Sequence, residues 1–197
     1  VIDGLADCGV PLSVDTRKVP VMLGALAAGA DMINDIGGFT APGAIDAVAR
    51  GSCGLCVMHM QGEPATMQQA PSYGDVVSEV EDFLRDRIDA LRAAGVAAGR
   101  IVVDPGIGFG QKRWHNLQLL EALDRLCGLG QPILVGVSRK SLIGELTGRP
   151  VERRLAGSLA AALAAVARGA RIVRVHDVAE TRDALRVWHA VDGAGVL

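Results

Sequence analysis

The sequence has few aromatic residues, no basic excess and no long hydrophobic run. Aromatic side chains make up 3% of its 197 residues, whereas alanine, glycine, valine and leucine dominate, which is typical of parallel strands covered by helices. The formal net charge of -2 argues against nucleic-acid and membrane-surface binding, which need a basic excess. No apolar run approaches the roughly 20 residues of a membrane-spanning helix. We therefore expect neither a nucleic-acid partner nor a membrane.

Cysteine is scarce as well. Two of the four cysteines form Cys53-Gly-Leu-Cys56, a spacing that metal and redox motifs share. Cys56 lies in an apolar run that predicts a strand, residues three apart in a strand point to opposite faces, and the sequence has no second pair to complete a zinc site. We interpret both cysteines as structural and expect the protein in the reducing cytoplasm.

Apolar runs alternate with amphipathic segments along the chain, without a linker. The runs predict strands at residues 11–16, 32–36, 54–60, 101–104, 133–138 and 171–176. The amphipathic or alanine-rich segments predict helices at 19–29, 44–50, 75–94, 116–126, 154–168 and 179–191, with a polar loop at 61–74. We therefore expect one α/β domain over residues 1–197.

Each predicted strand ends in polar or ionisable residues, and this pattern distinguishes two architectures. In an open doubly wound sheet only the switch-point strands bring their ends to one crevice, whereas in a (β/α)8 TIM barrel all the ends surround one mouth. The barrel is therefore favoured. Because a barrel has eight strands in about 250 residues, we expect six of its eight βα units here, two N-terminal units missing, and residues 1–8 to end a helix. The polar ends are Asp15, Asn34, His59, Asp104, Ser138 to Lys140, and Arg174 with His176.

Acidic and amide groups at three strand ends indicate recognition of a flat heterocycle. Asp15, Asn34 and Asp104 can accept hydrogen bonds from adjacent ring N–H groups, although each aspartate can instead cap a turn. The segment Asp104-Pro-Gly-Ile-Gly-Phe-Gly110 has GxGxG rather than GxGxxG spacing, which argues against a dinucleotide site. Its glycines let the backbone approach a flat ligand beside Phe109, or serve packing alone.

Cations gather at the ends of the last two predicted strands. Ser138-Arg-Lys-Ser141 follows one strand, and a strand over 171–176 would place Arg174 and His176 on the same face. Loops after the last strands of a barrel frequently bind phosphate, which arginine contacts through two donors. The pattern predicts an anion site, and the alternative is a solvated basic loop with a core histidine.

Six motifs together resemble the dihydropteroate synthases, the pterin-binding TIM-barrel enzymes of folate biosynthesis. The resemblance covers essentially the whole chain. It implies a transferase that condenses 6-hydroxymethyl-7,8-dihydropterin diphosphate with p-aminobenzoate to give 7,8-dihydropteroate and pyrophosphate. The motifs are Leu12-Ser-Val-Asp-Thr16, Ile33-Asn-Asp-Ile36, Val57-Met-His-Met-Gln-Gly62, Asp104-Pro-Gly-Ile-Gly-Phe-Gly110, Gly136-Val-Ser-Arg-Lys-Ser141 and Ile172-Val-Arg-Val-His-Asp-Val178.

The resemblance also implies roles for single residues. The diphosphate would be bound by Arg174 and His176, and the carboxylate of p-aminobenzoate by Ser141. The catalytic residues would be Arg174, His176 and Lys140. Mg2+ would be the cofactor, with its ligand in the missing N-terminal segment and none in this chain, and the enzyme would be a homodimer and a sulfonamide target. The pterin ring would be held by Asp15, Asn34, Asp104 and Lys140, in a slot shaped by Met58, Phe109 and Gly136.

Two departures from the family and two alternatives remain. Gln111 stands where members usually carry lysine, and the absent N-terminal strands lead us to expect that this chain alone binds pterin poorly. A methyltetrahydrofolate:corrinoid methyltransferase would share the Asp and Asn pattern, but it needs no diphosphate site, so the basic loop argues against it. A non-catalytic barrel fragment that serves in assembly is the second alternative.

Overall fold

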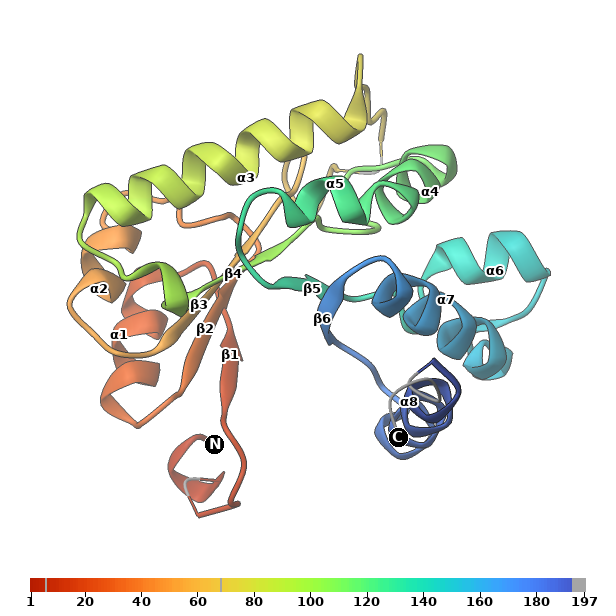
Figure 1. Ribbon diagram of the computed structural model, residues 1–197. Helices are drawn as coiled ribbons and strands as arrows, with labels where there is room; N and C mark the ends of the chain where they lie inside the picture. Colours follow the sequence, from red (N-terminus) through yellow and green to blue (C-terminus); the bar gives the residue numbers. More distant parts are fainter. Residues whose placement is uncertain (6, 68, 193–197) are drawn as a thin grey trace.

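The fold is built on a parallel β-sheet whose strands follow one another in chain order. A computed structural model describes residues 1–5, 7–67 and 69–192. Its six strands are ordered β1-β2-β3-β4-β5-β6, and each neighbouring pair is parallel (Figure 1). Five of them lie within the predicted runs, and β6 begins one residue before its predicted run and ends three residues early. The strands are β1 (Ser13–Asp15), β2 (Met32–Asp35), β3 (Gly54–Met58), β4 (Ile101–Asp104), β5 (Ile133–Val135) and β6 (Ala170–Val173).

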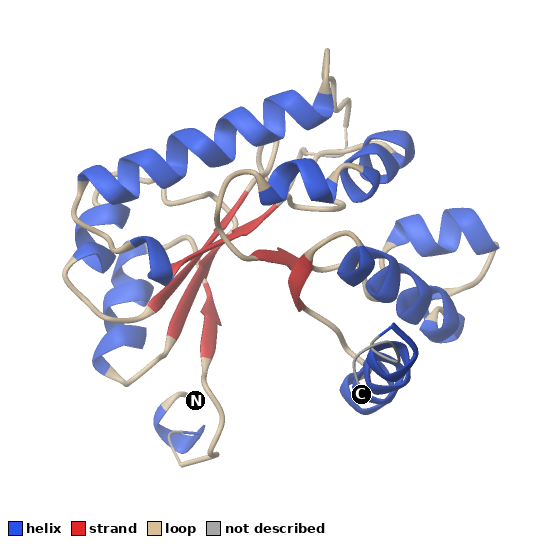
Figure 2. Ribbon diagram, in the orientation of Figure 1, coloured by secondary structure: helices blue, strands red, loops and turns tan. Residues whose placement is uncertain are grey.

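Helices follow each strand and lie along the outer side of the curved sheet (Figure 2). In a (β/α)8 barrel neighbouring strands follow one another in chain order, whereas in a doubly wound sheet the strand order reverses at the switch point. The chain therefore forms six βα units of a TIM barrel, as the strand ends predicted. The helices are α1 (Val19–Ala27), α2 (Ala44–Ala49), α3 (Val76–Ala93), α4 (Arg113–Glu121), α5 (Leu123–Cys127), α6 (Ser141–Thr147), α7 (Leu155–Ala167) and α8 (Val178–Asp192), with 3-10 turns at Asp3–Leu5, Ala98–Arg100 and Val151–Arg153.

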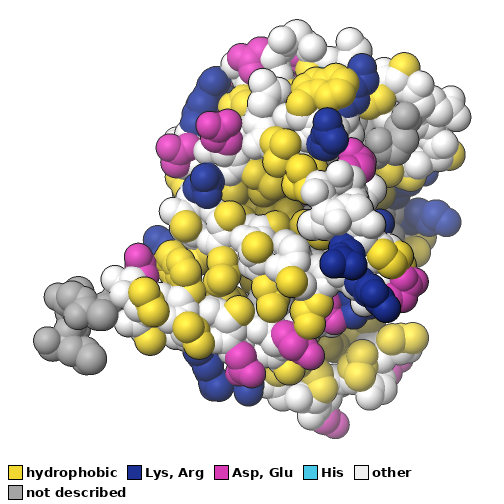
Figure 3. Space-filling model, turned by 90° about the vertical axis from the view of Figure 1, so that its right-hand side faces the viewer, with side chains coloured by type: hydrophobic (Ala, Val, Ile, Leu, Met, Phe, Trp, Pro, Cys, Tyr) yellow, Lys and Arg dark blue, Asp and Glu magenta, His cyan; other side chains and the backbone are white. Residues whose placement is uncertain are grey.

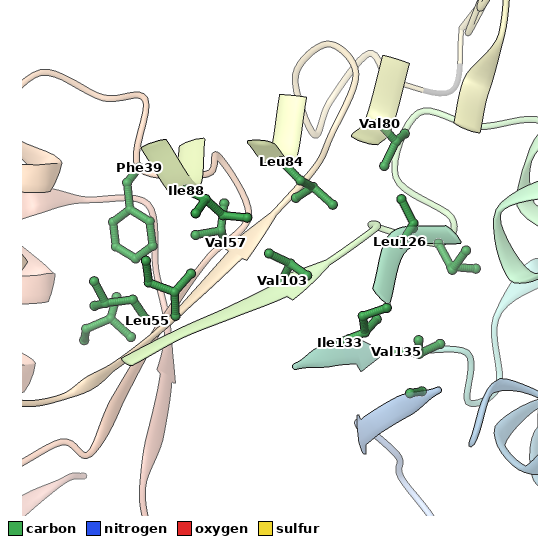
Figure 4. Close-up of a cluster of buried hydrophobic side chains, with 14 of the residues drawn as sticks. Phe39, Leu55, Val57, Val80, Leu84, Ile88, Val103, Leu126, Ile133 and Val135 are labelled. Carbon is green, nitrogen blue, oxygen red and sulfur yellow. The ribbon is translucent and has the colours of Figure 1, made fainter. Parts of the chain in front are cut away.

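The main hydrophobic core lies between the helices and the outward side chains of the strands. Helix α3 begins where the Asp75 carboxylate accepts hydrogen bonds from Val77 N and Ser78 N, and its apolar residues recur every three or four positions. Full burial of one such aliphatic side chain contributes roughly 1.5–3 kcal/mol, so this stripe fixes α3 against the sheet. Figure 4 shows Val80, Leu84 and Ile88 of α3 above strand residues Val57, Val103, Ile133 and Val135.

The concave face of the sheet carries a second, smaller set of apolar side chains. Cys56, Val102 and Leu134 are buried together, and Met32 and Ile172 pack against them. Successive residues of a strand point to opposite faces, so the residues two positions further along share this concave side. Those residues are Asn34, Met58, Asp104, Gly136 and Arg174, and the sheet thus aims the predicted pterin and anion residues toward one side.

The end of the sheet differs from the prediction in two strands. Strand β5 ends at Val135 and β6 at Val173, so Ser138, Arg174 and His176 lie beyond the strands. The argument that one strand places Arg174 and His176 on the same face was therefore wrong. Arg174 is nevertheless aligned, because its N–H donates to Val135 O at 3.0 Å, while the next residues turn toward α8.

Two helical segments also differ. The helix predicted at 116–126 begins earlier, at Arg113, and is divided at Ala122, whose ψ of 20° departs from helical geometry. Helix α6 was not predicted, because it has only seven residues and contains Gly144. At the start of the chain, where the end of a helix was expected, the described residues form the 3-10 turn Asp3–Leu5.

The cysteines and the helices settle two further points. All four cysteines are free, and Cys53 packs in the main core whereas Cys56 lies on the concave face. The two side chains thus lie on opposite sides of the sheet, as the strand spacing predicted.

No helix in the described part of the chain has the length and apolar character required to cross a bilayer.

Candidate functional site

The polar residues at the strand ends, His59 excepted, form one continuous group on the concave side. Asn34 Nδ2 donates to Asp15 Oδ2 at 2.8 Å, which joins the ends of β1 and β2. Across the sheet, Asp104 ends β4 and lies in register with Met58 of β3. The charge of Asp15 contributes to raising the pKa of Asp104, so these two carboxylates belong to the same electrostatic environment. The residues predicted from separate motifs are therefore brought together.

Two buried acceptor atoms are the main feature of this group. Asn34 is 4% exposed and Asp104 is 1% exposed. Within the described residues, Asn34 Oδ1 and Asp104 Oδ2 have no hydrogen-bond partner. Asp104 Oδ1 accepts from Gly106 N at 2.7 Å, which fixes the orientation of the carboxylate. A buried acceptor without a partner costs about 1–3 kcal/mol, so a ligand that supplies N–H groups gains from filling both positions.

Arg174 balances the buried charge of Asp104. Its Nη2 lies 3.5 Å from Asp104 Oδ2, and the arginine side chain is 37% exposed whereas the aspartate is closed to solvent. Burial raises the pKa of Asp104, while the Arg174 and Lys140 charges oppose that rise. A Cβ on Gly136 would lie 3.1 Å from Arg174 Nη2, so the absent side chain gives the guanidinium its place. Arg174 thus extends from the buried aspartate to the solvent-exposed side of the site.

Lys140 approaches the same group from the loop after β5. Its Nζ donates to Ile107 O and lies 4.6 Å from the centre of the Phe109 ring, a cation–π contact. Burial lowers the pKa of Lys140 to about 8, with Asp104 opposing the shift and Arg174 adding to it. Phe109 and Lys140 are both half-buried and form one wall of the site.

The glycine-rich loop at residues 105–110 must lie very close to its neighbours. Gly106 has φ of 74°, and a Cβ there would be 1.8 Å from His59 O. Gly110 has φ of 77°, and a Cβ there would be 2.4 Å from Gln61 O. These two positions require glycine for both conformation and space. The loop therefore stacks on the segment after β3 and presents Ile107 O and Phe109 to the site.

A basic rim lies beside this group of buried residues. His176 is exposed, its N–H donates to Ser138 Oγ at 3.2 Å, and its Nδ1 lies 3.0 Å from the same oxygen. Arg139 forms a two-point ion pair with Asp177, one contact being Nε to Oδ2 at 3.1 Å. Arg139 is thus neutralised, and Arg174 and His176 are the basic groups that face the open side. Ser141, the first residue of α6, is exposed next to Lys140.

Several residues of this site were not identified from the sequence. Asp35 is buried and accepts from Gly37 N and Phe39 N, so it orders the turn after β2. Gln111 and Asn116, both almost fully buried, hold the backbone of the glycine-rich loop. A polar residue directly after a glycine-rich segment was the available signal for Gln111. His59, predicted as core or pocket lining, lies against Phe83 on the helix side of the sheet.

The donor set suits an organic ligand with an anionic group better than a metal ion held by protein alone. Among the described residues, no three His, Cys, Asp or Glu side chains are grouped as metal ligands. Buried acceptors on one side and cations on the other match a heterocycle that donates hydrogen bonds and carries an anion.

Comparison with known proteins gives consistent matches. The family model described as "Pterin binding enzyme" matches residues 1–176. The dihydropteroate synthase of Neisseria meningitidis serogroup B is 51% identical over an alignment of 197 positions, which covers 97% of this chain and 69% of that protein. The crystal structure of dihydropteroate synthase from Stenotrophomonas maltophilia, with imidazole bound in its active site, is 52% identical and has a TM-score of 0.95, covering 98% of this chain and 73% of that one. The Burkholderia cenocepacia dihydropteroate synthase complexed with 7,8-dihydropteroate is 58% identical with a TM-score of 0.93, covering 98% and 72%.

Proposed function

This chain belongs to the pterin-binding enzyme family, and from that premise we propose how its own residues serve a dihydropteroate synthase. The reaction is the condensation of 6-hydroxymethyl-7,8-dihydropterin diphosphate with p-aminobenzoate, which yields 7,8-dihydropteroate and pyrophosphate. The observation that carries the assignment of roles is the pair of buried acceptors, Asn34 Oδ1 and Asp104 Oδ2, next to Arg174. The relatives found are dihydropteroate synthases, which argues against the corrinoid methyltransferase.

The pterin ring binds between the strand ends. Asp104 accepts hydrogen bonds from the amino and ring N–H groups of the pterin, and Asn34 with Asp15 completes the set of polar partners. Lys140 donates to a ring acceptor. The ring lies in a slot whose surfaces come from Met58, Phe109 and Gly136, since Met58 is fully buried at the floor and Gly136 adds no side chain.

The diphosphate binds at the basic rim, where Arg174 and His176 stabilise the leaving group. The C–O bond between the pterin methylene carbon and the diphosphate breaks, and its electron pair leaves with pyrophosphate. The neutral amine of p-aminobenzoate forms the new C–N bond and then loses a proton to solvent. Because negative charge grows on the leaving oxygen, the fixed charge of Arg174 and hydrogen-bond donors beside it lower the barrier, and no strong base is required. Lys140 contributes by holding the ring beside these cations.

The exposed hydroxyl of Ser141 lies one residue from Lys140 and is suited to the carboxylate of p-aminobenzoate. This placement sets the aromatic amine on the open side of the pterin methylene. Because of this placement, we expect p-aminobenzoate, or a sulfonamide in its place, to bind only after the pterin diphosphate has bound. The bound pterin diphosphate would supply one surface of the second site.

Mg2+ is the expected cofactor, and the residues described here do not make a site for it. They lack a cluster of three acidic or histidine ligands, and the rim is basic. Mg2+ keeps several waters and binds through substrate phosphates with one or two carboxylates. We therefore derive no step through the metal from this chain. Titration calorimetry should detect no Mg2+ binding without pyrophosphate, and a tight site without it would contradict this view.

A homodimer is supported by an apolar groove on the face that lies to the right in Figure 1. The groove has a volume of about 500 Å3 and lies between α4, α6 and α7. Figure 3 shows hydrophobic side chains gathered across this face. Leu117 and Leu146 are 40% and 55% exposed at its edge, and Glu121 and Arg168 provide opposite charges that a two-fold contact can pair.

The proposal also includes a cytoplasmic location and a single domain over residues 1–197. The free cysteines support the location, and the continuous core supports the single domain.

The roles of the pterin residues are tested with Asp104→Asn in the complete protein. The substitution keeps the acceptor for Gly106 N but places an NH2 group where the pterin N–H groups must bind, so the affinity for the pterin should fall by about 100-fold. Asp177→Asn, which alters a carboxylate of the same rim, is the control and should leave pterin binding intact. Unchanged pterin affinity in Asp104→Asn would overturn this assignment.

A second experiment tests the order of binding. Binding of p-aminobenzoate is measured by calorimetry with and without pyrophosphate and a pterin. Binding that requires the diphosphate supports a shared site. Equal affinity in both conditions would show that Ser141 and the rim are not arranged as proposed.

A further inference from the structure

The glycine-rich loop that forms the pterin slot has little conformational preference of its own. Gly106, Gly108 and Gly110 all have positive φ, at 74°, 85° and 77°. Glycine loses more backbone freedom on ordering than any other residue, so three alternating glycines form a loop that external contacts must hold. The position of Phe109, which lies between two of them, depends on those contacts.

Side-chain oxygens from outside the loop hold its backbone N–H groups. Asn116 Oδ1 accepts from Gly108 N at 2.7 Å, and Gln111 Oε1 accepts from Phe109 N at 2.7 Å. Phe109 N also donates to Gly106 O at 2.8 Å, so the carboxamide of Gln111 strengthens a turn that the backbone already forms. Consecutive N–H groups are thus bound by two carboxamides, from Gln111 and Asn116.

The two carboxamides are held differently. Asn116 is 4% exposed, and its Nδ2 donates to Lys112 O at 3.2 Å, which anchors it to the first turn of α4. Gln111 is held by burial, since it is 3% exposed and, within the described residues, its Nε2 has no hydrogen-bond partner. Its backbone directly follows Gly110, whose carbonyl accepts from Tyr73 Oη at 2.9 Å. The Asn116 amide therefore links the slot to α4, whereas Gln111 acts through its Oε1 alone.

The consequence of this arrangement reaches the substrate side of the loop. While the two carboxamides bind its N–H groups, the loop places Ile107 O and the Phe109 ring next to the Lys140 ammonium. We propose that Gln111 and Asn116 are positioning residues that act through Phe109 and Lys140 to set the width of the pterin slot. This inference rests on the pterin slot proposed above, and it assigns to each carboxamide a share of the pterin affinity.

The experiment uses the complete enzyme with Gln111→Met and Asn116→Leu, which remove the acceptors with little change in volume. Each should raise the Kd for the pterin diphosphate about threefold to tenfold, the range expected for one lost hydrogen bond. Gln118→Met, at an exposed carboxamide on the same helix, is the matched control and should bind as the wild type does. Asn116→Asp keeps the Oδ1 acceptor for Gly108 N but loses the Nδ2 donor to Lys112 O, so it should bind more weakly than the wild type. If Asn116→Leu fails to fold, Gln111→Met tests the inference by itself.

A double-mutant cycle separates positioning from general stability. In a Phe109→Ala background, Gln111→Met should raise the Kd by less than twofold, because the ring through which it acts is gone. Full additivity with Phe109→Ala, or wild-type affinity in both folded single variants, would overturn the inference. A wild-type enzyme that fails to bind the pterin diphosphate would instead refute the proposed function, so the two failures are distinct.

Discussion

Arg174 Nη2 lies 3.5 Å from Asp104 Oδ2 and packs over Gly136, so a single guanidinium joins the pterin half of the site to its diphosphate half. The aspartate is buried and the arginine is partly open to solvent. Burial raises the pKa of Asp104 and the attraction to Arg174 opposes that rise, while the remaining guanidinium donors face the rim.

Replacing Arg174 by alanine should weaken binding of the pterin diphosphate by about 100-fold, since a charged pair of hydrogen bonds is lost. A bare pterin should lose less, about tenfold, because only the indirect support of Asp104 is removed. Calorimetry with both ligands measures the difference. Arg153→Ala, at an exposed arginine, serves as the control. Equal losses for the two ligands would mean that the anion site lies elsewhere.

The lowered pKa of Lys140 predicts an alkaline limit on activity. Below about pH 8 the ammonium is protonated and donates, and as the pH rises through about 8 the proton and the charge are lost. We therefore expect kcat/KM to fall with a midpoint near that pH. Lys140→Arg, which keeps its charge at any accessible pH, should reduce the rate but move the alkaline limb upward. An identical limb in wild type and variant would assign the titration to another group.

Gly106→Ala should destabilise the protein by more than about 3 kcal/mol, because the new Cβ meets His59 O at 1.8 Å in addition to the strain of φ 74°. Gly130 is the matched control. It has φ of 75° but open space around a Cβ, so Gly130→Ala should cost only about 1 kcal/mol. Denaturant unfolding of both variants measures the difference, and similar losses would show that backbone conformation alone decides.

Leu146→Glu should shift the protein from dimer to monomer, because a charge at the edge of the apolar groove must be desolvated on assembly. The expected change is at least tenfold in the dimer dissociation constant, measured by analytical ultracentrifugation. Leu23→Glu, at a leucine of α1 with 51% exposure outside the groove, should leave assembly unchanged. A dimer that tolerates Leu146→Glu places the interface on another face.

The sequence by itself determined the alternation of strands and helices, the barrel architecture and the polar residues at the strand ends. These features depend on local sequence. An apolar run of five residues, an amphipathic stripe or a glycine triplet predicts the same local structure in any tertiary context. The prediction was weakest at element ends. The short α6 and the early end of β6 at Val173 depend on contacts with neighbouring segments rather than on composition.

Only the tertiary structure decided which of the polar groups act together. Spacing does not reveal that one Asp104 oxygen accepts a hydrogen bond while the other has only the ion pair with Arg174. Nor does it reveal that Asp177 neutralises Arg139, or that Gln111 and Asn116 hold the backbone of the glycine-rich loop. Each depends on distances of a few ångströms between residues far apart in the chain. Hydrogen bonds and ion pairs lose their strength beyond that range, so the packed sheet, and not the order of residues, determines them.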